Sequence, residues 1–569
     1  MLGLYGLITY ITAILRELTY PQPLIFKRWT FFNPPPLGRI YLVALYITLI
    51  LILLLKDSIV SGAWYYETLA FRAAWCSVSQ VPLIFLLAQK SSIVGFLIGS
   101  SHERLNWAHR TVARILLFTV TIHFSFFWRE WSIYHVVESE IVMMPMVKYG
   151  LGAYFTLMWI VFSAFVPIRN LRYELFVVQH ILSFVVFVTL LMLHIPVYAR
   201  VYIYCAMGFY GADRLLRTVR LVYCNLAMFH RGKRGMLTCR AHITALPGHA
   251  TRITIKDPPL HSWSPGQHVF LSFPTMSPFQ SHPFTIASIP NSHKELTFVV
   301  RAKAGFSRRI YKRAVSLLPT AAEPAKEQSF AVLVDGPYGC PPNLVQYDTL
   351  VLIAASTGVT FTIPILLSAV EASSRHCVRR IEFLWIVKAG SHFEWCAEEI
   401  RHAMQAAEDR GIELEITCCV TCDPSYTTNN PIRHPFRRHA KPCGCSCQSE
   451  ISSEAAFTEK LNPIEKKAAD RISITTVSSA SKSAVNSCCC SAGQTEDALV
   501  CVQAGRPDLR GVIERNLRTA RGETGVAVCG PVGLMARTRT VVAELSDERG
   551  AGKGTGAYGV FLFGEGFGW

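Results

Sequence analysis

The chain has 569 residues, 51% of them hydrophobic, and a mean hydropathy of +0.29. This length allows several domains, and the apolar content is high for a wholly soluble protein. The formal net charge of +17 would suit nucleic acid, but the basic residues lie at the ends of long apolar segments. The sequence therefore predicts a lipid bilayer, and no nucleic acid, as the partner.

Long apolar segments are confined to about the first 225 residues, and each is close to the ~20 residues that cross a hydrocarbon core. The segment 2–15 is shorter and ends at Arg16 and Glu17. It leaves a seventh span, an interfacial helix and a signal anchor as alternatives. The six predicted spans are residues 40–55, 81–99, 112–127, 149–166, 175–196 and 201–222.

Basic residues predict the orientation of these spans. The connection 128–148 carries three glutamates instead and should face outward, whereas the C-terminal half should lie in the cytosol. The basic residues that would face the cytosol are Lys27, Arg28, Arg39, Arg104, Arg110, Arg169, Arg172, Arg214, Arg217 and Arg220.

Four histidines lie in these spans as two pairs with the same spacing: His109 and His123, then His180 and His194. Fourteen residues are nearly four helical turns, so the members of a pair face the same way, about 21 Å apart. Ionisable groups are costly in a membrane, and neutral imidazole is a ligand of heme iron. We expect two b-type hemes: an inner one on His109 and His180, and an outer one on His123 and His194.

The rest of the chain changes to short strands. Residues 251–255, 268–273, 296–300 and 331–334 predict a small antiparallel barrel. The strand Thr349–Ala355 then leads through a turn of small residues at 356–360 into an apolar helix, which is the layout of a dinucleotide phosphate site. Further strands at 381–387, 414–420 and 525–528 continue an α/β alternation.

An ordered set of motifs accompanies these elements. It comprises the two histidine pairs, His282-Pro283-Phe284-Thr285, Asp335-Gly336-Pro337-Tyr338-Gly339, the turn at 356–360, Gly505-Arg506-Pro507, Cys529-Gly530-Pro531 and the ending Phe567-Gly568-Trp569. With this set the chain resembles the ferric reductase family, the fungal ferric/cupric reductase transmembrane components related to NADPH oxidases.

The resemblance implies a multi-domain fold. An α-helical transmembrane bundle of six to seven spans would precede an antiparallel β-barrel FAD domain and an α/β NADPH-binding domain of ferredoxin–NADP reductase type. The implied boundaries are 1–38 for an N-terminal segment, 39–225 for the di-heme domain, 226–340 for the FAD domain and 341–569 for the NADPH domain. Residues from about 423 to 500 are expected to be a disordered Cys- and Ser-rich insert with reduced cytosolic thiols; metal binding and palmitoylation are alternatives.

The resemblance also implies residue roles. His282, Pro283, Phe284 and Thr285 would hold FAD, with Gly305 and Ser307 beside its phosphates. The NADPH site would comprise Gly336, Pro337, Tyr338, Gly339, Ser356, Thr357, Gly358, Thr360, Gly530 and Pro531, with Arg506 at the 2′-phosphate. The catalytic residues would be Cys529 beside the nicotinamide and Trp569 stacked on the flavin. The sequence departs from the family at Ala355-Ser356, where glycines are preferred. The methyl of Ala355 would crowd the phosphate, so this departure concerns NADPH affinity.

The implied activity is that of an NADPH-dependent ferric-chelate reductase for iron uptake. Electrons would pass from NADPH through FAD and two hemes to Fe(III), or Cu(II), outside the plasma membrane; a vacuolar membrane would suit the same topology. One alternative is a superoxide-generating NADPH oxidase, although such oxidases usually carry proline after the Thr of the 357–362 segment. Another is a non-catalytic heme-binding membrane protein.

The outward connection 128–148 contains two sets of residues that could bind metal ions. Its carboxylates, Glu130, Glu138 and Glu140, suit ferric ions, and its thioethers, Met143, Met144 and Met146, suit cuprous ion. A solvated loop is the simpler interpretation.

Overall fold

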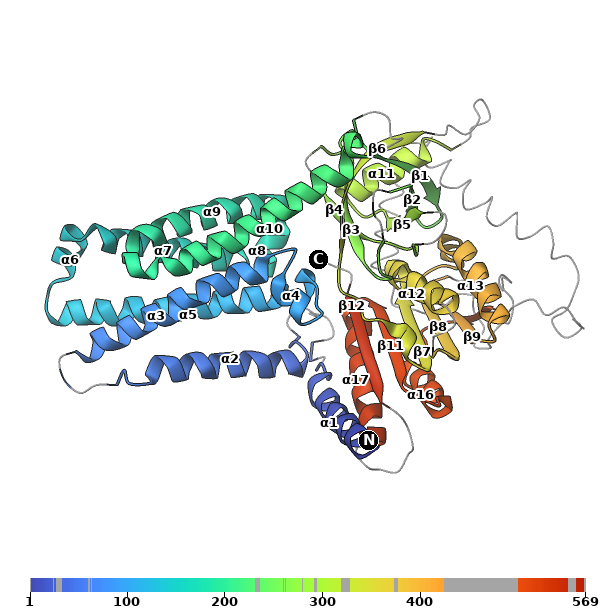
Figure 1. Cartoon of the computed structure of the whole chain (residues 1–569), viewed down its shortest axis with the longest axis horizontal. Helices are drawn as coiled ribbons and strands as arrows, with labels where there is room; N and C mark the ends of the chain where they lie inside the picture. The colour runs from blue at the N-terminus through green and yellow to red at the C-terminus, as the bar shows by residue number, and fades with distance from the viewer. Residues whose placement is uncertain are drawn as a thin grey trace, which may run out of the picture. The chain divides into compact units, whose positions relative to one another are not determined.

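A computed structural model describes the chain except for residues 1, 24, 27–32, 60–61, 63, 231–235, 259, 261, 279, 291–293, 319–327, 373–376, 424–499, 551–558 and 567–569. Its contacts divide the chain into two units (Figure 1). The helical unit comprises Arg39–Arg220, and the two-sheet unit comprises Met1–Gly38 with Leu221–Trp569.

The helical unit contains long helices joined by short ones. Among the described residues, five helices are long and apolar enough to cross a membrane: α2 (Leu37–Leu55), α3 (Tyr65–Ala88), α5 (His102–Ile133), α7 (Pro145–Ser163) and α9 (Tyr173–His194). The short helices are α4 (Ile93–Leu97), α6 (Val137–Met143) and α8 (Val166–Leu171). The sixth predicted span is the helix α10 (Val201–Asn225), whose second half carries four charged residues and so does not meet this criterion.

The second span begins earlier than its apolar residues predicted. The prediction was 81–99, whereas α3 runs from Tyr65 to Ala88. Polar residues at 77 and 80 interrupt the apolar run, yet both are buried and bonded to α5. Ser77 Oγ donates to Thr119 Oγ1 over 2.8 Å, and Gln80 Nε2 donates to the same oxygen over 3.2 Å. Polar residues with partners on a neighbouring helix are compatible with a span, and hydropathy alone cannot recognise them.

The N-terminal segment forms helix α1 (Leu2–Thr19), which belongs to the two-sheet unit and is not among the candidate spans. It packs along α17 (Val532–Gly550) (Figure 1). The Arg16 guanidinium donates to the Val560 carbonyl over 2.8 Å. Of the three alternatives for residues 2–15, the seventh span is therefore not among the candidate spans found in the described residues.

The first sheet is the predicted barrel. Its six antiparallel strands are β1 (Cys239–Leu246), β2 (Ala250–Lys256), β3 (His268–Ser272), β4 (His282–Thr285), β5 (Glu295–Arg301) and β6 (Ser329–Tyr338), in the order β4-β3-β6-β1-β2-β5. Alternating apolar residues turn inward, and Ile253, Leu271 and Phe298 are fully buried. The end strands β4 and β5 contact each other, and α11 (Gly305–Val315) packs against β1 and β2.

The second sheet is fully parallel, in the order β10-β9-β8-β7-β11-β12. Its strands are β7 (Thr349–Ala355), β8 (Arg380–Val387), β9 (Glu413–Val420), β10 (Val500–Ala504), β11 (Thr524–Gly530) and β12 (Val560–Gly566). Helix α12 (Val359–Glu371) packs on α13 (Ala397–Asp409), and α16 (Leu509–Thr519) packs on α17. The prediction for β7 is confirmed, because a strand buried on both faces is a continuous apolar run. The predicted insert falls almost wholly outside the described residues.

Side chains bridge the two sheets. Arg252 on β2 pairs with Glu399 on α13 at 2.7 Å and donates to the Trp395 carbonyl over 2.8 Å. Trp395 in turn donates to the Pro247 carbonyl over 2.8 Å, and His392 stacks on Trp395 with ring centres 4.4 Å apart. These contacts hold the barrel against the parallel sheet.

His392 should make this unit sensitive to acid. Burial, reinforced by Arg301, lowers the pKa of His392 to about 3. As the pH falls below the ordinary pKa of about 6.5, His392 takes up a proton in the unfolded chain but not in the folded chain. This difference lowers the free energy of unfolding by up to about 2 kcal/mol at pH 5. His392→Phe keeps the stack on Trp395 without the titration. We expect its melting midpoint, followed by tryptophan fluorescence, to fall less than that of the unmodified chain between pH 7 and about pH 5. Equal falls would contradict this role.

Candidate functional site

The pair predicted to lie furthest outward is brought together in the helical unit. The rings of His123 and His194 are 6.1 Å apart between centres, at 66°. His123 Nδ1 donates to the Ala70 carbonyl over 3.0 Å, and His194 Nδ1 donates to the Met146 carbonyl over 2.8 Å. A carbonyl can only accept, so the proton is on Nδ1 and each Nε2 keeps its lone pair for a metal.

Both rings line one cavity of about 520 Å³, a volume typical of small-molecule sites. Its wall is mainly apolar and aromatic, including Phe71, Trp75 and Phe127. Two imidazoles that share one metal through bonds of about 2.0 Å place their ring centres about 6 Å apart. No group of three or more acidic, His or Cys side chains that would hold a bare ion occurs in the described part of the chain. The site therefore suits a metal group that supplies its other ligands itself.

In the second predicted pair, one histidine makes the same kind of hydrogen bond. His109 Nδ1 donates to the Ile84 carbonyl over 3.0 Å. His180 lies beside Phe176, and its Nδ1 is a buried polar atom without a hydrogen-bond partner in the part of the chain that the structure describes. Each of the four histidines therefore has a ring nitrogen that no described hydrogen bond uses.

In the barrel, the predicted flavin motif forms β4, an end strand. The contact of β4 with β5 brings the flavin motif close to the first turn of α11. The rings of His282 and Phe306 stack there, with centres 4.4 Å apart. Gly305 has φ of +54° and opens the helix, and the Lys303 amide donates to Ser307 Oγ over 3.1 Å. Barrel closure thus gathers the predicted residues of 282–285 and 305–307. Sequence reasoning missed Phe306, whose only signal was an aromatic residue after the glycine.

The 335–339 motif was expected to be a turn, but residues 335–338 form the end of β6 and pair with β3. Gly336 has φ of +155°, and a Cβ there would lie 2.7 Å from Val269 Cγ1. Tyr338 donates its hydroxyl proton to Asp335 over 2.6 Å, and both residues are buried. Glycine at 336 is therefore required by close packing; Pro337 lies in the same strand end, and Gly339 follows it directly.

At the carboxyl edge of the parallel sheet, two predicted motifs adjoin. The 356–358 turn opens α12, and the Thr360 hydroxyl donates to the Thr357 carbonyl over 2.9 Å. Cys529 pairs with Ala354 in the sheet register, and a Cβ on Gly358 would lie 2.4 Å from the Cys529 carbonyl oxygen. A helix start at this edge is the kind of place where backbone amides can bind a phosphate.

The departure from the family's glycines is located at Ser356. Ser356 has φ of +50°, in the left-handed region that favours glycine, whereas Ala355 is extended with φ of −121°. The sequence argument had attributed the departure to the methyl of Ala355. The conformation shows that the substitution of serine at 356 is the one that carries backbone strain.

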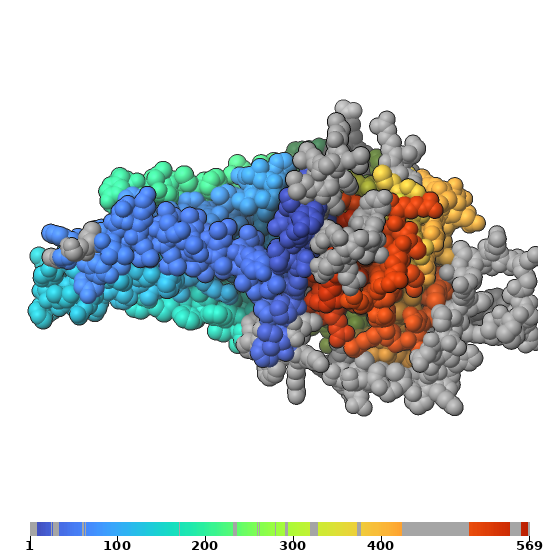
Figure 2. All heavy atoms as spheres, turned by 90° about the horizontal axis from the view of Figure 1, so that it is seen from below, coloured from blue at the N-terminus to red at the C-terminus, as the bar shows by residue number. Residues whose placement is uncertain are grey.

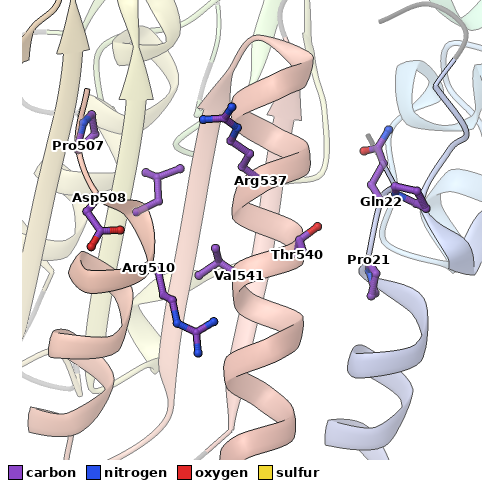
Figure 3. Close-up of a pocket in the computed structure, with 10 residues that line it drawn as sticks. Pro21, Gln22, Pro507, Asp508, Arg510, Arg537, Thr540 and Val541 are labelled. Atoms are coloured by element: carbon purple, nitrogen blue, oxygen red, sulfur yellow. The ribbon is translucent and has the colours of Figure 1, made fainter. Parts of the chain in front are cut away.

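Arg506 follows β10 and is exposed. Strand β10 lies three strands from β7, about 14 Å away, on the side opposite β11 and Cys529. An extended dinucleotide could therefore contact Arg506 at one end and Cys529 at the other. Beside this loop, an open cavity of about 540 Å³ lies between α16, α17 and the segment after α1, with Asp508, Arg510, Arg537 and Gln22 around it (Figure 3).

Cys529 is buried, with 5% exposure, and is followed by Gly530 and Pro531. Burial, reinforced by Glu565, raises the pKa of the Cys529 thiol. A neutral, buried thiol should react slowly with alkylating agents. In iodoacetamide labelling at neutral pH followed by mass spectrometry, we expect Cys529 to be modified after the exposed Cys340 and Cys377. Modification of all three at one rate would contradict the buried placement.

The other predicted catalytic residue, Trp569, lies outside the described residues. Strand β12 ends at Gly566, which pairs with Gly530 of β11.

Three family models match the chain in order. They describe a ferric reductase like transmembrane component at residues 73–191, an FAD-binding domain at 236–342 and a ferric reductase NAD binding domain at 347–543. The chain belongs to the ferric reductase family. It has helices long and apolar enough to cross a membrane and matches binding domains for FAD and a nicotinamide dinucleotide, so the predicted fold class is confirmed.

Curated relatives of this ferric reductase family member carry corresponding names. The probable cell surface ferric reductase kap2 of Aspergillus oryzae is 26% identical over 411 residues, 66% of this chain and 53% of the relative. Two Saccharomyces cerevisiae relatives are ferric reductase transmembrane component 4 (24%; 51% of this chain, 38% of the relative) and ferric/cupric reductase transmembrane component 7 (23%; 58% and 52%). The chain thus spans about half the length of these relatives, or less.

Proposed function

We propose that this member of the ferric reductase family uses NADPH to reduce Fe(III), and also Cu(II), on the extracytoplasmic side of the plasma membrane for iron uptake. The observation that carries the proposal is the outer histidine pair, whose ring separation, Nδ1 hydrogen bonds and shared cavity suit one metal group between two imidazoles. The names of the relatives support the acceptor, and the flavin and nucleotide domains support the donor.

The metal groups would be two b-type hemes. His123 and His194 would hold the outer heme, and His109 and His180 the inner one. When bound, FAD converts the two-electron donor NADPH into a source of single electrons, and heme carries single electrons onward. The backbone carbonyls of Ile84, Ala70 and Met146 fix the tautomer of three of the histidines and orient their rings.

In the two-sheet unit we assign the flavin to the face between β4 and α11. His282 and Phe306 would present stacked rings, and the start of α11 at Gly305 would offer amides to the flavin phosphates. The 356–360 turn would hold the NADPH pyrophosphate, with Arg506 at the 2′-phosphate and Cys529 at the nicotinamide. The neutral Cys529 side chain would act by excluding water and shaping the site, because its thiol is buried.

Gly150 should be essential for the outer site. A Cβ on this residue would lie 2.6 Å from both Nδ1 and Cε1 of His194, so Gly150→Ala should push the imidazole away from the Met146 carbonyl. We expect the purified variant to lose outer-heme absorbance, measured as heme per chain, while FAD binding persists. Gly208→Ala is the matched control, because a Cβ there meets no atom within 4 Å. A full complement of heme in Gly150→Ala would exclude this positioning role.

The test of the function is an acceptor assay on intact cells that express the chain, with Fe(III) chelate, Cu(II) and O2 compared. We expect surface ferrous iron, trapped by an impermeant chelator, to exceed superoxide. Superoxide without ferrous product would identify an oxidase. Neither product, together with no NADPH-driven heme reduction in isolated membranes, would identify a non-catalytic heme protein.

A further inference from the structure

Helix α1 carries an apolar stripe that no described residue covers. Ile8, Ile11, Leu15 and Leu18 are 53%, 47%, 53% and 50% exposed. At about 100° per residue, these positions fall within one face about 80° wide. Ala13, which is 8% exposed, lies on the opposite side of the helix.

The opposite side is attached to the nucleotide-binding domain. The Arg16 guanidinium donates to the Val560 carbonyl and lies 5.9 Å from the centre of the Phe561 ring. Beyond the helix, Arg539 of α17 donates to Gln22 over 2.7 Å. Figure 1 and Figure 2 both show α1 alongside the C-terminal part of the chain. These contacts fix which side of α1 faces the domain, and the apolar stripe is on the side that stays exposed.

The end of α1 adjoins the first membrane-spanning helix. The Leu37 amide donates to the Pro21 carbonyl over 3.0 Å, and a Cβ on Gly38 would lie 2.9 Å from Thr19 Cβ. Leu37 is the first residue of α2, a candidate span. The start of a span is the place where the chain enters the bilayer, so the last turn of α1 must lie close to a membrane surface. In the connection, Ile25 and Phe26 are also exposed apolar residues.

We propose that α1 is an interfacial helix that docks on the lipid surface of the leaflet where α2 begins. Its stripe would enter the boundary between headgroups and acyl chains, as amphipathic helices do to a depth of about 5–10 Å. Its other side holds α17 and β12, so α1 tethers the nucleotide-binding domain to the membrane. This role does not depend on the hemes or on the acceptor.

Photocrosslinking of the full chain tests the tether. The photoreactive residue p-benzoylphenylalanine replaces Leu15 in the stripe or, as the matched control, Tyr10, which is also exposed but lies well away from the stripe around the helix. The chain is reconstituted in vesicles of phosphatidylcholine and phosphatidylserine, irradiated and analysed by mass spectrometry. We expect phospholipid adducts at position 15 to exceed those at position 10 several-fold.

Two outcomes would overturn the proposal. Equal lipid yields at the two positions would show that the stripe does not face lipid. Adducts between position 15 and a second copy of the chain would show that the stripe is a dimer interface instead. A second measurement is the hydrogen exchange of α1, which should be slower in vesicles than in detergent for the unmodified chain and for the control Tyr10→Glu. The Leu15→Glu variant should lose this difference. The same difference between vesicles and detergent in all three chains would also overturn the proposal.

Discussion

Replacement of His194 by alanine is expected to lower the heme content by half and to reduce surface Fe(III) reduction to the background of cells without the chain. His194 faces His123 at 6.1 Å between ring centres, and both line the same cavity. With one imidazole removed, the metal group loses one of the two protein ligands that we assign to it. Heme per chain, the dithionite-reduced spectrum and ferrous product on intact cells are the measurements.

A variant on the same helix serves as the control for His194→Ala. Thr189 is exposed and its hydroxyl donates to the Val185 carbonyl within α9, so Thr189→Ala removes a polar group without touching the cavity. It should keep both hemes and full activity. FAD should stay bound in both variants, because the flavin site lies in the two-sheet unit. Normal extracellular iron reduction by His194→Ala would refute the proposed electron path.

The sequence predicted most reliably the features that depend on periodicity. The two histidine spacings, together with the basic residues at the ends of the spans, predicted which histidines would meet, and the structure brings His123 and His194 together. The bounds of β7 were predicted to the residue, since a strand buried on both faces leaves a continuous apolar run. Both patterns are formed by residues close in sequence, so they can be recognised without knowledge of the tertiary structure.

The features that the sequence could not predict depend on a partner elsewhere in the chain. Ser77 and Gln80 looked like the end of a membrane segment until Thr119 supplied their hydrogen bonds. Gly150 is one small residue in an apolar helix, and only the position of His194 gives it a role. Likewise, the sequence left three alternatives for residues 2–15, and only the contacts of α1 with α17 and with the start of α2 show where its two faces lie.

Substitution of Gly358 is expected to impair nucleotide binding as strongly as substitution of His194 impairs heme binding. Its Cα packs against the end of β11, so that an added Cβ would lie 2.4 Å from the Cys529 carbonyl oxygen and 2.9 Å from its carbon. Neither atom is the end of a flexible side chain. The Gly358→Ala variant must therefore move the start of α12 away from Cys529, and overpacking of this kind costs about 1–3 kcal/mol.

We expect Gly358→Ala to weaken NADP⁺ binding by about tenfold or more, measured by calorimetry, and to slow reduction of the flavin by NADPH while FAD and heme contents stay normal. Gly533→Ala is the matched control: it adds the same methyl in the first turn of α17, where a Cβ meets no atom within 4 Å. If both variants bound NADP⁺ as the unmodified chain does, the 356–360 turn would not be the phosphate site. Loss of binding in Gly358→Ala alone would instead locate the pyrophosphate at the junction of β7, β11 and α12, the place that the close packing of Gly358 on Cys529 builds.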